Sequence, residues 1–225
     1  MHPLLDNILW HSFTGSLAPF TTGTSRARRF SPGFPAILGF ADLHNPAFAD
    51  LTPHCAPGEH FYTGDWSGPV HAGWKIEEES SMFRMVLDPA TSVTDDSPDI
   101  VPLQPAHAAQ ALALATLTKP GPFGARTLEL GEYFGCFDGP QLVAMAGERF
   151  HAGPYREISA VCTHPDYQGR GLARRLMNRL ICRQRQRGET TFLHVMSGND
   201  RAHAFYERFG FRNHLHATVR VVTRI

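Results

Sequence analysis

The sequence lacks an excess of charge of either sign and any long hydrophobic run. Its 225 residues contain 21 Lys and Arg against 21 Asp and Glu, so the formal net charge is zero. This balance provides no long-range field for nucleic acid or an anionic membrane, and we expect neither as a partner. No apolar stretch is long enough to span a bilayer. No basic flank precedes a sustained apolar run at the N-terminus, so we expect no signal peptide.

The few cysteines exclude two further classes of protein. Cys55, Cys136, Cys162 and Cys182 are widely separated and form no C-x-x-C pair, so neither a disulfide framework nor a zinc knuckle is expected. The thirteen histidines include no H-E-x-x-H motif, and we expect no metal site. With 42% hydrophobic residues, the chain should bury a substantial core. A cytoplasmic globular protein is the expectation.

A polar stretch divides the chain. Residues 88–97 are rich in Asp, Ser, Thr and Pro, which is typical of a linker. We therefore expect an N-terminal region, residues 1–97, followed by a domain of residues 98–225. In the first part, "NPAFADL" predicts a short helix capped by Asn45, and "EHFYTG" and "SMFRMVL" predict strands. This smaller α/β region contains no motif that indicates a particular reaction.

The second part has clearer patterns. Asp138-Gly139 lies between two apolar runs and predicts a hairpin of antiparallel strands. Leucines recur at every fourth residue after Gly171, which predicts one apolar helix face. The expected helices cover residues 106–117, 172–187 and 199–209, and the other expected strands cover residues 157–163, 190–196 and 215–225. These elements predict an α/β domain whose sheet need not be all parallel.

A glycine loop joins the strand "EISAVCT" to the helix that follows it. Gly169 and Gly171 bring bare backbone to the start of this helix, where unpaired N–H groups and the helix dipole favour phosphate. Arg170 and Arg174 could add charged hydrogen bonds. A tight turn that needs glycine only for its dihedral angles is the alternative. The P-loop and dinucleotide motifs do not fit, because Leu172-Ala173 replaces K-[ST] and Arg174 replaces the third glycine.

Two motifs together resemble the GNAT superfamily of acyl-CoA-dependent N-acetyltransferases. The run "HPDYQGRGLARRL" matches the pattern Q/R-x-x-G-x-G/A at Gln168, Gly171 and Ala173, and "NDRAHAFYERFGF" matches a second superfamily motif. The resemblance covers about one domain, from Asp99 onward, and includes the glycine N-acyltransferase-like branch. It implies a mixed, mainly antiparallel twisted sheet flanked by helices, and acetyl-CoA as the acyl donor without a metal.

The same resemblance implies where the coenzyme lies. Backbone groups of Val161, Cys162 and Thr163 would contact the pantetheine arm at a splay in the sheet, and the loop would hold the pyrophosphate. Asn199 would contact the coenzyme or cap the helix after it. The residues implied for the loop are Gln168, Gly169, Arg170, Gly171, Leu172, Ala173 and Arg174.

Acyl transfer to an amine raises two proton problems. An alkyl amine has a pKa of about 10.4 and needs to lose a proton, and the thiolate that leaves has a pKa of about 8.5. The resemblance implies Glu157 as the candidate base, directly or through water, and an ion pair with Arg149 or Arg156 is its alternative role. It implies Tyr206 as the candidate acid, and packing against the core is its alternative. Cys162 in an apolar strand suggests no covalent catalysis.

The expected reaction is direct transfer of an acetyl or short acyl group to the primary amine of a small molecule or amino acid. Acetylation of a protein lysine or N-terminus is one alternative, and a non-catalytic acyl-CoA sensor is another. A homodimer is compatible with the sequence.

Overall fold

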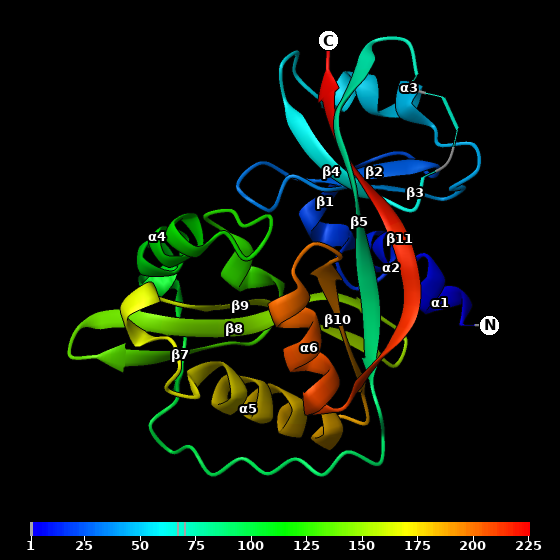
Figure 1. Ribbon diagram of the computed structural model, residues 1–225. Coiled ribbons are helices and arrows are strands. Elements are labelled where there is room, and N and C mark those ends of the chain that lie inside the picture. Colours follow the sequence, from blue (N-terminus) through cyan, green and yellow to red (C-terminus); the bar gives the residue numbers. More distant parts are fainter. Residues whose placement is uncertain (1, 67, 70) are drawn as a thin grey trace.

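The computed structural model describes residues 2–66, 68–69 and 71–225, and an eight-stranded sheet forms its largest element (Figure 1). The strand order is β4-β11-β5-β10-β9-β8-β7-β6, and all neighbours are antiparallel except β9 and β10. The strands are β4 (His60–Gly64), β5 (Trp74–Leu87), β6 (Val101–Pro102), β7 (Tyr133–Asp138), β8 (Gln141–Ala152), β9 (Tyr155–Thr163), β10 (Thr190–Met196) and β11 (Phe211–Arg224). The predicted mixed, mainly antiparallel α/β fold is confirmed.

A small second sheet, six α-helices and five short 3-10 helices complete the fold of the described residues. The second sheet has the order β1-β2-β3. Its strands are β1 (Thr21–Gly23), β2 (Ala27–Phe30) and β3 (Leu38–Phe40), and the helices are α1 (Pro3–Asp6), α2 (Ile8–Thr14), α3 (Phe48–Leu51), α4 (Ala108–Thr118), α5 (Leu172–Gln186) and α6 (Asp200–Phe209). Helix α3 begins after Ala47 rather than at Asn45, so the predicted Asn45 cap is wrong. The predicted hairpin at Asp138-Gly139 joins β7 to β8, with Gly139 at φ 54°.

Helices cover both faces of the large sheet because its central strands are apolar on both sides. Met85 and Leu193 pack in the core beneath α5 and α6, whereas their neighbours Val86 and Phe192 pack beneath α1 and α2. Successive side chains of a strand point to opposite faces, so these two cores lie on opposite sides of the sheet. Helix α4 packs over β8 and β9 through a third core that includes Ala111, Leu114 and Cys162.

The large sheet crosses the expected boundary at residue 97. Strand β5 lies between β10 and β11, and it pairs with β11 from Phe211 opposite Leu87 to Arg224 opposite Trp74. The stretch of residues 88–97 has no helix or strand, as expected of a linker, but it runs along α5 (Figure 1). Asn178 and Arg185 of that helix donate hydrogen bonds to the carbonyls of Thr94 and Thr91. The division into residues 1–97 and 98–225 therefore stays a prediction.

Candidate active site

A cleft of about 490 Å³ lies between the end of β9, the start of α5 and helix α6. All the residues predicted to contact the coenzyme line this cleft except Arg170, and the candidate acid Tyr206 lines it as well. The other lining residues, which the sequence did not reveal, are Tyr167, Arg201, Ala202, Phe205 and Arg208. Residues far apart in the chain thus converge where the glycine loop meets α6.

The glycine loop exposes bare backbone to this cleft. Gly169 and Gly171 have φ values of 77° and 76°, and a Cβ at either position would meet no other atom within 4 Å. Gly171 is the N-cap of the 15-residue helix α5, so the first backbone N–H groups of the helix lack intrahelical partners there. Arg170 does not line the cleft, because its guanidinium lies over the Tyr167 ring and donates to the Asp166 carbonyl.

Three exposed arginines add positive charge around the cleft. Arg174 lies at the start of α5, with its guanidinium carbon 4.9 Å from the centre of the Phe209 ring, and Arg201 and Arg208 belong to α6. None of the three forms an ion pair or hydrogen bond with another residue in the described part of the chain. Arg201 and Arg208 are about two helical turns apart and so share one helix face, a spacing that could have been recognised in the sequence.

Strands β9 and β10 separate beside the cleft. They pair only from Tyr155 opposite Thr190 to Glu157 opposite Phe192. Further along β9 a bulge interrupts pairing with β8, and Ala160 adopts φ 53°, which is unusual for a residue with a side chain. The bulge changes the alternation of side chains, so that Val161 packs beneath α5 while Cys162 faces α4. This break in strand pairing, the opening, begins beyond Glu157.

Tyr206 and Cys162 approach each other at this opening from the two sides. Burial, together with a smaller effect of the nearby Cys162 thiol, raises the pKa of Tyr206 to about 12. Burial also raises the pKa of Cys162 to about 11. Both groups therefore remain protonated at neutral pH. The thiol is a poor nucleophile in this state, in keeping with the prediction of no covalent catalysis.

Glu157 is fully buried and ion-paired. Arg149 donates two hydrogen bonds to its carboxylate, at 2.8 and 2.9 Å, and the backbone N–H of Phe150 donates a third. Burial opposes ionisation of Glu157, but Arg149 and His194 outweigh it and lower the pKa of Glu157 to about 2. The alternative role in an ion pair with Arg149 is thus observed. The role of Glu157 as a base stays a prediction.

The pair belongs to a row of charged and neutral polar groups, joined by hydrogen bonds, that crosses four adjacent strands. Arg84 of β5 donates from Nε to His194 Nε2 at 2.9 Å, and His194 Nδ1 lies 2.7 Å from Glu157 Oε1. Because arginine only donates, His194 carries its proton on Nδ1 and donates it to Glu157. Burial lowers the pKa of His194, so the ring is neutral. The row fixes β5, β10, β9 and β8 against one another.

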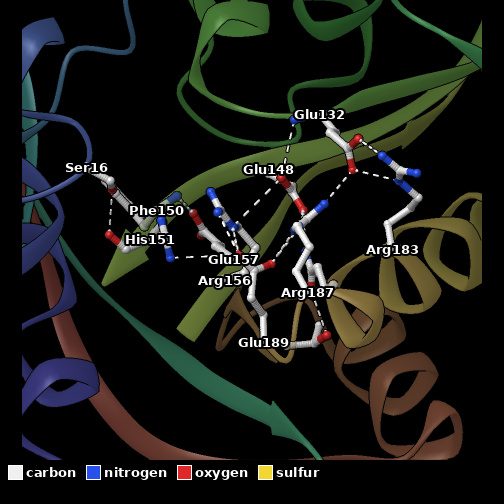
Figure 2. Close-up of polar contacts among 12 residues, drawn as sticks. Ser16, Glu132, Glu148, Phe150, His151, Arg156, Glu157, Arg183, Arg187 and Glu189 are labelled. Atoms are coloured by element: carbon white, nitrogen blue, oxygen red, sulfur yellow. Dashed lines mark hydrogen bonds and ion pairs between the residues drawn. The ribbon is translucent and has the colours of Figure 1, made fainter. Parts of the chain in front are cut away.

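A second ionic network fastens α5 to the sheet. Figure 2 shows Glu148 on β8, with Arg183 and Arg187 reaching toward the sheet from the end of α5. Arg187 pairs with Glu148, and also with Glu132 at 2.6 Å and Glu189 at 2.8 Å. Arg156 pairs with Glu189 at 2.8 Å rather than with Glu157. These contacts hold the helix whose other end forms the glycine loop.

Asn199 caps helix α6 and also lines the cleft, so its place is compatible with both roles expected from the sequence. Its side-chain oxygen accepts a hydrogen bond from Ala202 N at 3.1 Å as the N-cap of α6, and the residue also lines the cleft.

Among the described residues, no group of three or more His, Cys, Asp or Glu is arranged to hold a metal ion. Within the same ranges, no helix combines the length and apolar character needed to cross a membrane.

The chain is similar in sequence and fold to known acetyltransferases of the GNAT family. The pattern of the family described as FR47-like protein matches residues 133–221. A solved GNAT-family protein from Novosphingobium aromaticivorans is 30% identical and superimposes with a TM-score of 0.88, covering 98% of each chain. A GCN5-related N-acetyltransferase from Kribbella flavida has a TM-score of 0.62 over 96% of this chain and 94% of its own, but at 14% identity this likeness concerns the fold alone.

A curated relative matches a shorter stretch. The N-alpha-acetyltransferase RimI of Mycobacterium tuberculosis is 36% identical over 83 residues, which is 36% of this chain. The match spans about half, 51%, of the length of that relative.

Proposed function

Because the chain belongs to the GNAT family of N-acetyltransferases, we propose that it transfers an acetyl or short acyl group from coenzyme A to a primary amine. The observation that carries this proposal is the cleft in which three unpaired arginines surround the bare N-terminus of α5. Diphosphate and phosphate groups match that combination of charge and backbone donors. The open space at Gly169 and Gly171 leaves room for their close approach.

Each part of the donor would have its own set of residues. The N–H groups after Gly171 would bind the pyrophosphate, and Arg174 with Arg201 and Arg208 would neutralise its charge. The freed edge of β9 beyond Glu157 would hold the pantetheine arm, with Val161 and Cys162 nearest the reacting end. A backbone N–H there would stabilise negative charge on the thioester oxygen.

Tyr206 would act on the leaving sulfur. With a pKa of about 12, its hydroxyl is a much weaker acid than a thiol of pKa about 8.5. Complete proton transfer to the thiolate is therefore uphill by more than three pKa units. Tyr206 accordingly stabilises the thiolate mainly by donating a hydrogen bond. The proton that the amine releases then protonates the thiolate to give the free thiol.

The acceptor must reach the thioester as a free amine, since only that form is a nucleophile. The buried, paired Glu157, with a pKa of about 2, is poorly matched to taking a proton from an alkyl amine. It would serve instead to position β9 beside the opening through Arg149 and His194. The ammonium form of the acceptor can instead lose its proton to solvent, which gives the free amine without a protein base.

We favour a small amine or amino acid as the acceptor. The likeness to RimI over 83 residues supports a second candidate, the α-amino group of a protein. A homodimer and a cytoplasmic location stay predictions.

Two measurements test the proposal. Calorimetry with acetyl-CoA should give saturable binding at one site per chain, and thiol release should follow addition of an amine. The panel contains glycine, phenylalaninamide, benzylamine and a peptide that begins with alanine. Binding without release from any of them would favour the non-catalytic sensor, and absence of binding would refute the proposal.

A further inference from the structure

Tyr133, at the start of β7, has a buried hydroxyl without a partner. The residue is 2% exposed, and its Oη forms no hydrogen bond with any residue in the described ranges. Leaving such a group unsatisfied costs about 1–3 kcal/mol, whereas phenylalanine would fill the same space without that cost. Buried hydroxyls of this kind are uncommon and call for an explanation.

The ring of Tyr133 lies across the neighbouring strand. Gly147 of β8 is opposite Tyr133, and a Cβ at Gly147 would come within 2.1–2.3 Å of three atoms of the ring. Only glycine leaves this space free. Strands are about 4.8 Å apart, so the ring passes over β8 and carries its hydroxyl toward β9.

The hydroxyl therefore lies near the bulge of β9. Ser159 is opposite Gly147 in the next strand pair, directly before Ala160. The pKa of Tyr133 is raised, first by burial, and Arg149, Glu157 and Cys162 all influence it, which agrees with a position beside β9. Ser159 is only partly buried, whereas the Tyr133 hydroxyl itself is fully buried.

This position is on the side of the sheet opposite the coenzyme cleft. Tyr133 packs in the core beneath α4 together with Ala160 and Cys162, whereas Val161 and Tyr206 pack in the core beneath α5 and α6. Cys162 belongs to both regions, because it also lines the cleft. A thioester carbon at the opening could thus be approached from the α4 side, where Tyr133 lies.

We propose that Tyr133 binds the acceptor amine, with its Oη accepting a hydrogen bond from the N–H of the amine beside the bulge of β9. This inference rests on the proposed function. The hydroxyl stays neutral, so it orients the amine and takes no proton from it. Its chemistry suits a neutral primary amine, which offers two N–H donors and one lone pair for attack.

The test compares Tyr133→Phe with Tyr155→Phe. Tyr155 supplies a matched control because its hydroxyl already contacts His2 Nδ1 at 2.8 Å, at the opposite end of β9. The acceptor probe is the panel member that the unaltered protein acetylates fastest. We expect Tyr133→Phe to reduce kcat/KM for that amine about fivefold to tenfold, the equivalent of one hydrogen bond. The Kd for acetyl-CoA should stay unchanged and the Tm unchanged or higher, and Tyr155→Phe should retain full kcat/KM.

Unchanged kcat/KM in Tyr133→Phe would overturn the inference, even if acetyl-CoA binding and turnover establish the proposed function. A weaker Kd for acetyl-CoA would do the same, because it would assign the hydroxyl to the donor. A crystal structure with acetyl-CoA gives a readout that needs no acceptor. Tyr133 Oη should lie within about 6 Å of the thioester carbon, the sum of an attack distance and a hydrogen bond; a longer separation refutes the assignment.

Discussion

Replacement of Gly171 by glutamate should weaken acetyl-CoA binding about tenfold. The new carboxylate would stand at the N-terminus of α5, in open space that faces the cleft. At a separation of about 6 Å, two unit charges repel by about 0.7 kcal/mol in water and by about 3 kcal/mol at an effective dielectric constant of about 20. These limits correspond to roughly threefold and roughly a hundredfold in Kd. The effective dielectric constant in a partly open cleft lies between these two limits, so a loss of about tenfold is expected.

Gly188→Glu is the matched control for the backbone. Gly188 has φ 71°, and a Cβ there would also meet no other atom within 4 Å. Both substitutions therefore incur a similar cost of about 1–2 kcal/mol for a left-handed residue with a side chain. Gly188 lies at the far end of the same helix, about 25 Å away at 1.5 Å per residue, where salt screens its charge.

Calorimetry at two salt concentrations separates charge from strain. We expect Gly171→Glu to recover part of its affinity at high salt, since screening reduces the repulsion, while Gly188→Glu binds as the unaltered protein does. An unchanged affinity in Gly171→Glu would refute the assignment of the diphosphate to this loop. Equal losses in both variants would refute it as well, because they would make altered stability, not charge in the cleft, responsible.

The other predictions concern the arginines, the candidate acid and the buried pair. The double substitution Arg201→Gln with Arg208→Gln should weaken acetyl-CoA binding and reduce its salt dependence, as measured by calorimetry. An unchanged Kd, with an effect on kcat alone, would contradict this prediction. Tyr206→Phe should lower kcat by about tenfold or more with little change in Kd, because its hydroxyl acts on the leaving thiolate; undiminished turnover would end that role. Glu157→Gln should lower the free energy of unfolding by about 3–5 kcal/mol, since Arg149 would lose its buried partner. The pKa of Glu157 is lowered from 4.5 to about 2, so this stabilisation is present above pH 4.5 and is lost as pH falls toward 2, as acid unfolding should show. A pH–rate profile that Glu157→Gln leaves unchanged would exclude Glu157 as the base.

The half of the cleft that the glycine loop forms could be predicted because its signals are local. The glycine loop, the start of α5 and the cap of α6 depend on dihedral angles and helix ends, which neighbouring residues determine. Gly169 and Gly171 were identified on that basis, whereas the resemblance suggested Asn199 as a coenzyme contact, and all three line the cleft. Arg170 was also expected to contact the coenzyme, but it does not line the cleft, because its side chain lies over the Tyr167 ring.

The other half depends on contacts between distant residues. Arg84 and His194 are 110 positions apart, and neither has a local motif. The place of Tyr133 becomes apparent only when strand pairing puts Gly147 opposite it. The position of β5 was missed for the same reason, since a polar linker suggested two units where the sheet is continuous.

The location of β5 between β10 and β11 has a consequence for biosynthesis. On the ribosome this segment emerges more than a hundred residues before either partner and must wait with both edges unpaired. During that interval Trp74–Leu87 is a strand with both edges unpaired, which favours aggregation if translation of the last strand is slow.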